Sequence, residues 1–231
     1  MVLRVFRWAP GARERVQKYW IPVKEGMTVL DALVDAQRRL DPTLAFRYAC
    51  RVGMCGSCAM VINGRERWAC RTLLRGLRAG TVTVRPLYHF PLIRDLVVDM
   101  APMREKMMAV GAVFEPPAVG ADVPAVGGDS RERRRIDPAI ECIGCGMCVS
   151  ACTMVAHDRY FPGPAALNRA FTLQQDSRDA GHADRASRLL EGDALARCHG
   201  QGNCTAVCPM EISPTESIAT LRRQAVLRLF R

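Results

Sequence analysis

The sequence lacks any long hydrophobic run, so we expect no helix of this chain to cross a membrane. Its best candidate, residues 107–114, is short and is followed by Glu115, whereas a membrane-spanning helix needs about 20 apolar residues. A secretory pattern is also missing, because Arg4 and Arg7 interrupt the opening residues and no apolar stretch follows. We therefore expect a reducing compartment for the chain, and membrane attachment only through a partner.

Lysine is scarce as well. Three lysines accompany thirty arginines, and the net charge is +10. A basic balance suits an acidic subunit, anionic lipid headgroups or nucleic acid, and it equally suits arginines spread over solvated faces. A basic zinc module that binds nucleic acid is the weakest of these alternatives, since no recognisable module accompanies the charge. We expect no nucleic acid partner.

The chain has eleven cysteines. Because an odd number cannot all pair with one another, the count argues against a closed disulfide framework. In a reducing compartment, cysteines more often hold metals. The eleven form three groups, and their spacings are those of iron–sulfur clusters, which carry single electrons. The groups are Cys50, Cys55, Cys58 and Cys70; Cys142, Cys145, Cys148 and Cys152; and Cys198, Cys204 and Cys208.

The first group has a C-x4-C-x2-C spacing with a fourth cysteine further on, which is typical of a plant-type [2Fe–2S] centre. Gly53 and Gly56 lie inside this run. Because glycine has no Cβ, both allow backbone N–H groups to approach the cluster sulfurs and stabilise their negative charge. The alternative is a zinc ion held by four thiolates. Zinc usually favours paired C-x2-C knuckles, so we favour the iron–sulfur interpretation.

The other two groups have the spacing of bacterial two-cluster ferredoxins, in which the last cysteine of each run binds the other cluster. The last cysteine of the final run precedes Pro209, as that pattern requires. The expected ligands are Cys142, Cys145, Cys148 and Cys208 for a [4Fe–4S] cluster, and Cys152, Cys198 and Cys204 for the remaining cluster.

Gln201 stands where the complete pattern has the second cysteine of its last run. Three thiolates leave one corner of a cubane without a ligand, and a cubane that lacks that iron is a [3Fe–4S] cluster. We predict this cluster, since thiolate is the usual ligand of such irons. A [4Fe–4S] cluster whose fourth iron binds Gln201 or hydroxide is the alternative.

Residues 1–100 have the pattern of a small α/β unit. Alternating residues predict strands at 2–8, 16–23 and 81–84, and Asn63-Gly64 predicts a type I′ hairpin turn. Thr28 is expected to cap a helix, with Asp31 as its capping-box partner. By analogy, this order of elements fits the β-grasp plan of plant-type ferredoxins.

The rest of the chain is expected to be mainly helical. Residues 91–110 are predicted as a helix that Pro102 breaks or kinks, and residues 115–130, rich in Pro, Gly and Ala, as an exposed linker. The predicted fold is therefore α+β. It has a [2Fe–2S] domain over residues 1–100, a connecting helix and linker over 101–135, and an all-α ferredoxin domain with two further clusters over 136–231.

Three other side chains carry weaker signals. His199 follows a cluster cysteine and is a candidate for a proton-coupled acceptor site, although such a histidine more often bonds to nearby backbone. His157 has a weaker signal still. Trp68, two residues before Cys70, is expected to belong to the core or to shield the cluster.

Taken in order, the three cysteine groups resemble those of the iron–sulfur subunits of the succinate dehydrogenase/fumarate reductase family. Several stretches between the cysteines are similar too, and the resemblance extends nearly end to end. These stretches are Asp41-Pro42-Thr43-Leu44-Ala45-Phe46-Arg47, Ile93-Arg94-Asp95-Leu96-Val97-Val98-Asp99-Met100, Gly163-Pro164-Ala165-Ala166 and Asp176-Ser177-Arg178-Asp179.

The resemblance implies a subunit of a respiratory-chain or tricarboxylic acid cycle oxidoreductase. Its [2Fe–2S], [4Fe–4S] and [3Fe–4S] centres would link an FAD flavoprotein to a quinone site at hydrophobic membrane-anchor subunits, some of them haem-bearing. The subunit would lie peripherally on the cytoplasmic face of the cell membrane. Dicarboxylate chemistry would belong to the flavoprotein, so this chain would supply no catalytic residue. His199 stands where the dehydrogenase branch has a histidine, a candidate for the quinone site.

The chain departs from the family pattern after Cys152. Relatives commonly have proline next, and those that use a quinone near this subunit often have tryptophans just beyond it. Here the sequence is Cys152-Thr153-Met154-Val155-Ala156-His157. The alternative is therefore the same type of subunit in a complex with another flavoprotein substrate, or with a thiol–disulfide or soluble electron acceptor.

Overall fold

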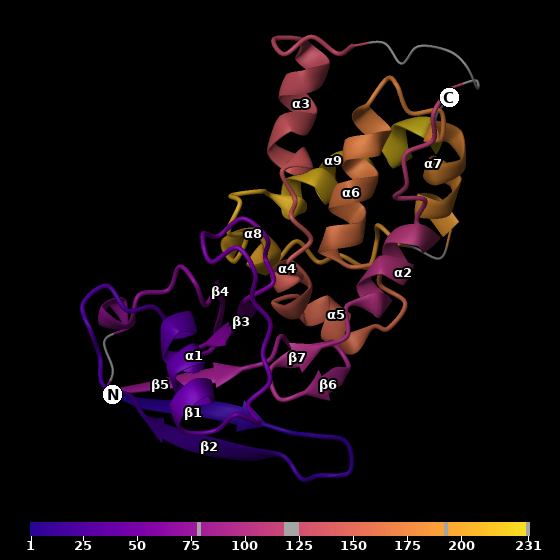
Figure 1. The fold of residues 1–231 in the computed structure, drawn as a ribbon. Coiled ribbons are helices and arrows are strands. Elements are labelled where there is room, and N and C mark those ends of the chain that lie inside the picture. Colours follow the sequence, from indigo (N-terminus) through magenta and orange to yellow (C-terminus); the bar gives the residue numbers. More distant parts are fainter. Residues whose placement is uncertain (78–79, 118–124, 192–193, 230–231) are drawn as a thin grey trace. The chain divides into compact units, whose positions relative to one another are not determined.

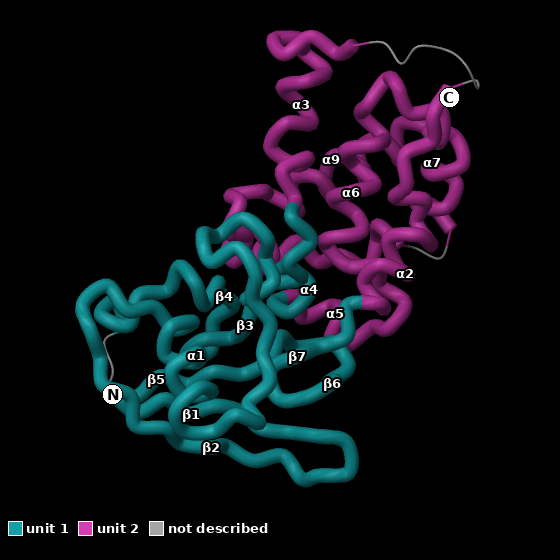
Figure 2. The backbone as a smooth tube through the Cα atoms, viewed as in Figure 1, with its two compact units in different colours: residues 1–100, 143–151 teal, residues 101–142, 152–231 magenta. Residues whose placement is uncertain are grey.

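The computed structural model describes residues 1–77, 80–117, 125–191 and 194–229. The chain divides into two compact units (Figure 2). Unit 1 contains Met1–Met100 and Ile143–Ala151, and unit 2 contains Ala101–Cys142 and Cys152–Arg231. The chain thus changes unit at residue 100, where the sequence predicts a boundary. It returns to unit 1 for residues 143–151, which the sequence assigns to the C-terminal domain.

Unit 1 is built on a five-stranded mixed sheet with the strand order β2-β1-β5-β3-β4 (Figure 1). Strand β1 pairs antiparallel with β2 and parallel with β5, and β3 pairs antiparallel with both β4 and β5. Helix α1 packs its apolar residues into the same core as the strands, as the β-grasp prediction requires. The elements are β1 (Val2–Arg7), β2 (Arg15–Trp20), α1 (Val29–Arg39), β3 (Ala59–Ile62), β4 (Arg65–Trp68), η1 (Leu74–Gly76) and β5 (Thr81–Arg85).

Two local predictions for unit 1 are confirmed. The Asp31 N–H donates to the Thr28 hydroxyl (3.2 Å), and the Thr28 N–H donates to the Asp31 carboxylate (2.9 Å), so both bonds of the capping box are present. Asn63 and Gly64 have φ values of 49° and 77°, the left-handed backbone that a type I′ turn needs. Local side-chain and turn chemistry therefore defines the start of α1 and the β3–β4 hairpin.

The predicted helix over residues 91–110 is wrong in its first half. Residues 92–98 form a two-stranded ribbon of β6 (Leu92–Arg94) and β7 (Val97–Val98), and α2 covers only Ala101–Ala109. Asp95 turns the chain between the strands with a φ of 46°. Its carboxylate accepts the N–H groups of Trp8 (3.0 Å) and Ala45 (2.9 Å) and the Nε–H of Arg7 (2.9 Å). These distant partners override the helical pattern.

Besides α1 and η1, unit 1 contains the short helix α4 (Met147–Ser150), and the remaining helices in the described part of the chain belong to unit 2. Helix α6 is the central element of unit 2, since it contacts α2, α3, α7 and α9. The predicted boundary at residue 136 falls inside α3, and residues 118–124 of the predicted linker lie outside the described part of the chain. None of the described helices combines the length and apolar character needed to span a bilayer. The helices are α3 (Arg131–Ile140), α5 (Thr153–His157), α6 (Pro164–Gln175), α7 (His182–Leu190), α8 (Asn203–Ala206) and α9 (Pro214–Leu229).

A buried ion pair joins α7 of unit 2 to the loop before it. Arg185 is 1% exposed, and its Nη2 lies 2.8 Å from an Asp179 carboxylate oxygen. The same guanidinium donates to the backbone carbonyls of Gly111 (2.8 Å) and Val113 (3.1 Å). Because Gly111 and Val113 lie 74 and 72 positions before Arg185 along the chain, the Arg185 side chain fixes tertiary structure in unit 2.

Replacing Arg185 with methionine is expected to reduce the free energy of unfolding by about 3–5 kcal/mol, because the Asp179 charge is left buried without its cation. The matched control is Arg188→Met. It breaks an exposed ion pair with Asp184 on the same helix and should cost about 0.5 kcal/mol or less. Urea unfolding followed by helical circular dichroism measures both. Equal losses in the two variants would contradict a structural role for the buried pair.

Candidate iron–sulfur centres

The first cysteine group lies on a loop of unit 1 that curls around its own sulfurs. The backbone N–H groups of Met54 and Cys55 both donate to the Cys50 Sγ at 3.3 Å. Gly53 and Gly56 have φ values of 79° and 70°, which side chains with a Cβ adopt only under strain. The two glycines thus bend the loop so that N–H groups face the Cys50 sulfur, and their predicted role toward cluster sulfur stays a prediction.

The four cysteines of this loop and of the end of β4 interact as two pairs, Cys50 with Cys55 and Cys58 with Cys70. Hydrogen bonds from Ser57 and Cys50 lower the pKa of Cys55 to about 6. Burial raises the pKa of Cys58 to about 12, and its thiol interacts with that of Cys70. The first pair is half-buried and the second is buried. A [2Fe–2S] cluster takes two thiolates on each iron, so these four cysteines would suit such a cluster.

Trp68 lies against the same loop, at the end of β4. It is half-buried and packs on the core of unit 1. A Cβ added at Gly53 would lie 3.0 Å from the Trp68 Cζ3 atom and 3.2 Å from Cε3, so the six-membered ring covers the loop there. Trp68 is therefore a core residue that also covers the cysteine loop. The sequence analysis offered these two roles as alternatives.

Residues 143–151 carry Cys145 and Cys148 and pack on this loop within unit 1. A Cβ at Gly56 would lie only 2.7 Å from the Cβ of Cys145, so the two backbones approach as closely as glycine allows. Helix α4 is held by Ser150, whose hydroxyl donates to the buried Glu66 carboxylate (2.7 Å) and accepts the Tyr88 N–H (2.9 Å). The sequence did not predict these contacts, because no motif near Glu66, Tyr88 or Ser150 indicates that they pair.

In unit 2, Cys198 and Cys204 lie close enough to Cys152 to influence its charge. Burial raises the pKa of Cys152, and the charges of Cys204 and Cys198 raise it further. The N–H groups of Met154 and Val155, in the first turn of α5, act in the opposite direction by bonding to the Cys152 sulfur. Three thiols that are close enough to influence one another, with N–H groups directed at sulfur, fit a cluster with three protein ligands.

Two cationic side chains lie near this group. The Lys106 ammonium of α2 donates to the Phe161 carbonyl (2.7 Å). Burial lowers its pKa, while the charges of Asp158 and Cys152 raise it. Arg222 of α9 donates to the backbone carbonyls of Leu195 (2.8 Å) and Cys198, so it holds the chain that leads into the second cysteine. Lys106 carries no motif and could not be found from the sequence.

The remaining predicted residues lie as follows. Gln201 is exposed and its carbonyl accepts a hydrogen bond from the Thr153 hydroxyl, next to Cys152. His199 and His157 are exposed in unit 2. Of the four expected [4Fe–4S] ligands, two belong to each unit. Among the described residues, no three His, Cys, Asp or Glu side chains are grouped to hold a single metal ion.

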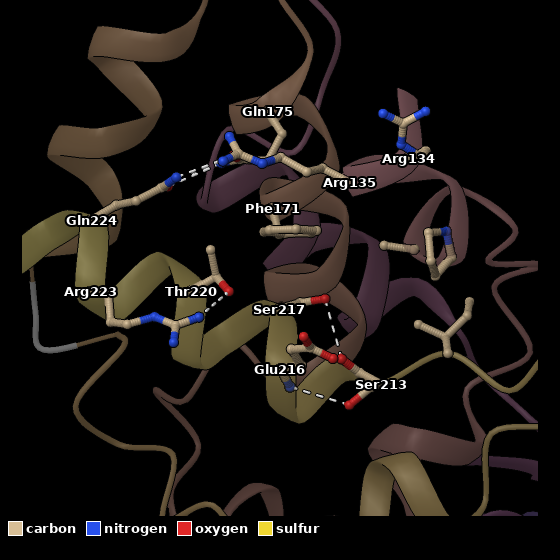
Figure 3. Close-up of a pocket in the computed structure, with 13 residues that line it drawn as sticks. Arg134, Arg135, Phe171, Gln175, Ser213, Glu216, Ser217, Thr220, Arg223 and Gln224 are labelled. Carbon is tan, nitrogen blue, oxygen red and sulfur yellow. Dashed lines mark hydrogen bonds between the residues drawn. The ribbon is translucent and has the colours of Figure 1, made fainter. Parts of the chain in front are cut away.

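A depression of about 450 Å³ in unit 2 lies among α3, α6 and α9 and contains none of the cysteines (Figure 3). Gln175 and Gln224 bond across it (3.1 Å), and Arg223 donates to Thr220 (3.0 Å). Four of its polar side chains are thus bonded to one another in two pairs within unit 2. It is separate from the sequence-predicted site.

Two family models match this chain. A "2Fe-2S iron-sulfur cluster binding domain" matches residues 2–105, and a "4Fe-4S dicluster domain" matches residues 138–212. The two matches follow the division of the cysteines into a first group and two later groups. They agree with the predicted β-grasp domain followed by a helical domain.

The chain is also similar to whole proteins. It is 38% identical to the fumarate reductase iron-sulfur subunit of Mycobacterium tuberculosis, over 94% of this chain and 90% of the relative. It is 36% identical to the succinate dehydrogenase iron-sulfur subunit of Paracoccus denitrificans, over 97% and 88%. A chain of the Mycobacterium smegmatis Sdh1 complex in the apo form superposes with a TM-score of 0.89 at 30% identity, covering all of this chain and 97% of that one.

Proposed function

The chain belongs to the family of iron–sulfur subunits of succinate dehydrogenase and fumarate reductase complexes, and on that basis we propose that it relays single electrons between an FAD flavoprotein and a quinone pool. The observation that carries the proposal is the grouping of cysteines on loops whose N–H groups face sulfur. When bound, the clusters supply the one-electron chemistry. The chain holds them, offsets their negative charge and keeps water from the inner ligands.

We assign the ligands by the spacing rule and by the groupings within each unit. The loop of residues 50–58 supplies three thiolates to a [2Fe–2S] centre and the β4 end supplies the fourth. In the two-cluster domain, the last cysteine of each run serves the other cluster. The ligands are Cys50, Cys55, Cys58 and Cys70 for [2Fe–2S], Cys142, Cys145, Cys148 and Cys208 for [4Fe–4S], and Cys152, Cys198 and Cys204 for [3Fe–4S].

The third centre is assigned as [3Fe–4S] because Gln201 stands in place of a fourth thiolate. Its side-chain carbonyl bonds to Thr153, and that supports a role outside the ligand set. We assign the exposed His199, next to Cys198, to the quinone site as a proton donor or acceptor. Its neighbour Cys198 is a proposed cluster ligand, so the imidazole lies next to the end of the electron pathway.

The partners follow from this assignment. One is an FAD flavoprotein that carries the dicarboxylate chemistry, and the other is a hydrophobic anchor that holds this subunit at the cytoplasmic face of the membrane. A second candidate function has the same relay with a thiol–disulfide or soluble acceptor. It is favoured by one observation, the run Cys152-Thr153-Met154, which has neither the proline nor the nearby tryptophans common among quinone-linked relatives.

The test is anaerobic purification of the chain with whatever subunits accompany it. We expect acid-labile sulfide, three distinct EPR signals on stepwise reduction, and a flavoprotein in the same complex. Quinone reduction that a quinone-site inhibitor stops would support the first function over the second. A preparation with bound zinc and no sulfide would contradict both.

A further inference from the structure

The indole N–H of Trp68 is an unexplained polar group. Its Nε1 atom is shut off from solvent and has no hydrogen-bond partner in the described part of the chain. A buried donor without an acceptor costs about 1–3 kcal/mol. Buried polar groups in folded proteins nearly always have a partner, so an isolated one indicates a group that the polypeptide alone does not contain.

The surroundings of Trp68 point to what that group is. The residue stands opposite Ala59 across the β3–β4 ladder, so it is one position from Cys58 and two from Cys70. Its six-membered ring covers Gly53, between the other two ligands of the loop. Trp68 also packs on the core cluster that includes Cys58 and Cys70. The indole therefore lies beside the cysteine loop and beside two of the four proposed [2Fe–2S] ligands.

Charge supports the same partner. A [2Fe–2S] cluster with four thiolates carries net negative charge, and its inorganic sulfides are hydrogen-bond acceptors that lie between the ligands. Hydrogen bonds to cluster sulfur are one of the means by which a protein sets the reduction potential. The N–H of a buried indole is a donor only, which suits a sulfide acceptor.

We propose that Trp68 donates its indole N–H to a sulfide of the [2Fe–2S] cluster and thereby raises the reduction potential of that cluster. The proposal rests on the [2Fe–2S] centre proposed above. Reduction adds negative charge to the cluster, and a donor directed at sulfur stabilises the reduced form more than the oxidised form. Trp68 is thus a tuning residue that contacts the cofactor, in addition to covering the loop.

The first experiment uses the wild-type complex with ¹⁵N-indole tryptophan. Pulsed EPR of the reduced [2Fe–2S] centre is expected to show one coupled ¹⁵N nucleus and one strongly coupled proton that exchanges in D2O. Because this measurement needs no variant, it does not depend on how a substitution folds. A [2Fe–2S] signal without indole ¹⁵N coupling overturns the proposal.

The second experiment compares Trp68→Phe with Trp20→Phe, which alters an indole that is 76% exposed on β2 of the same unit. Losing one hydrogen bond should lower the equilibrium constant for one-electron reduction about tenfold, or about 59 mV in a potentiometric titration. The shift should fall on the [2Fe–2S] centre alone, and Trp20→Phe should leave all potentials unchanged. An unshifted [2Fe–2S] potential, or a shift on another centre, contradicts the proposal.

Different results would contradict the proposed function and the role of Trp68. If no [2Fe–2S] signal exists in the wild-type complex, the proposed function fails. If the signal exists with normal intensity but the indole is not coupled to it, only the role of Trp68 fails. If Trp68→Phe loses the cluster, the indole ¹⁵N coupling in the wild-type complex still tests the role of Trp68.

Discussion

Replacing Gln201 with cysteine is expected to convert the third centre from [3Fe–4S] to [4Fe–4S]. The substitution completes the C-x2-C-x2-C-x3-C-P spacing in the last run and supplies a thiolate for the corner that lacks iron. Gln201 is exposed, and its side-chain carbonyl accepts a hydrogen bond from the Thr153 hydroxyl, so the exchange should leave the fold of unit 2 intact.

The measurement is EPR of the oxidised complex together with iron analysis. An oxidised [3Fe–4S] cluster is paramagnetic and an oxidised [4Fe–4S] cluster is not, so the signal of the oxidised wild type should disappear in Gln201→Cys while one iron is gained. Its reduction potential should fall by on the order of hundreds of mV, within the span that cluster type sets.

Gln201→Ala is the matched control, because it removes the bond to Thr153 without adding a thiolate. We expect it to keep the [3Fe–4S] signal. If instead the oxidised wild type is silent and Gln201→Ala creates the signal, Gln201 is a ligand of a four-iron cluster. That outcome would favour the alternative over our assignment.

Replacing Gly56 with alanine is expected to reduce the occupancy of two clusters at once. The new Cβ would lie 2.7 Å from the Cβ of Cys145 and 3.2 Å from the side chain of Ile143. The backbone beside Cys145 must therefore move. Because Gly56 follows a proposed [2Fe–2S] ligand and Cys145 is a proposed [4Fe–4S] ligand, the displacement disturbs both sites.

Gly26→Ala separates this clash from backbone strain. Gly26 has the same φ of 70° with nothing near its missing Cβ, so it should cost about 1–2 kcal/mol of stability and keep its clusters. Spin quantitation of both centres after anaerobic reduction, with sulfide analysis, measures the difference. Full occupancy in Gly56→Ala would show that the close approach is dispensable.

The parts of this molecule that could be predicted from sequence are those that local chemistry fixes. Cysteine spacing follows from cluster geometry. The start of α1 is fixed by Thr28 and Asp31, and the β3–β4 turn by Asn63 and Gly64, each within a few residues. The family resemblance was confirmed over nearly the whole chain.

What could not be predicted depends on partners far away in the chain. Asp95 makes a turn where periodicity favours a helix, because its carboxylate binds N–H groups of Trp8 and Ala45. Residues 143–151 join unit 1 partly through Ser150 and Glu66, which are 84 positions apart. No pattern within a short window carries such a pairing.

The discontinuity of unit 1 has a consequence for synthesis on the ribosome. Translation adds about 5–20 residues per second, and domains generally fold as units in the order in which they emerge. Here the nascent N-terminal module must wait for residue 151, after residues 101–142 have already emerged. Until then the Glu66 carboxylate lacks its bond from Ser150, and the backbone at Cys145 does not yet pack against Gly56 of the cysteine loop. Maturation of the first cluster is thereby tied to completion of much of the polypeptide.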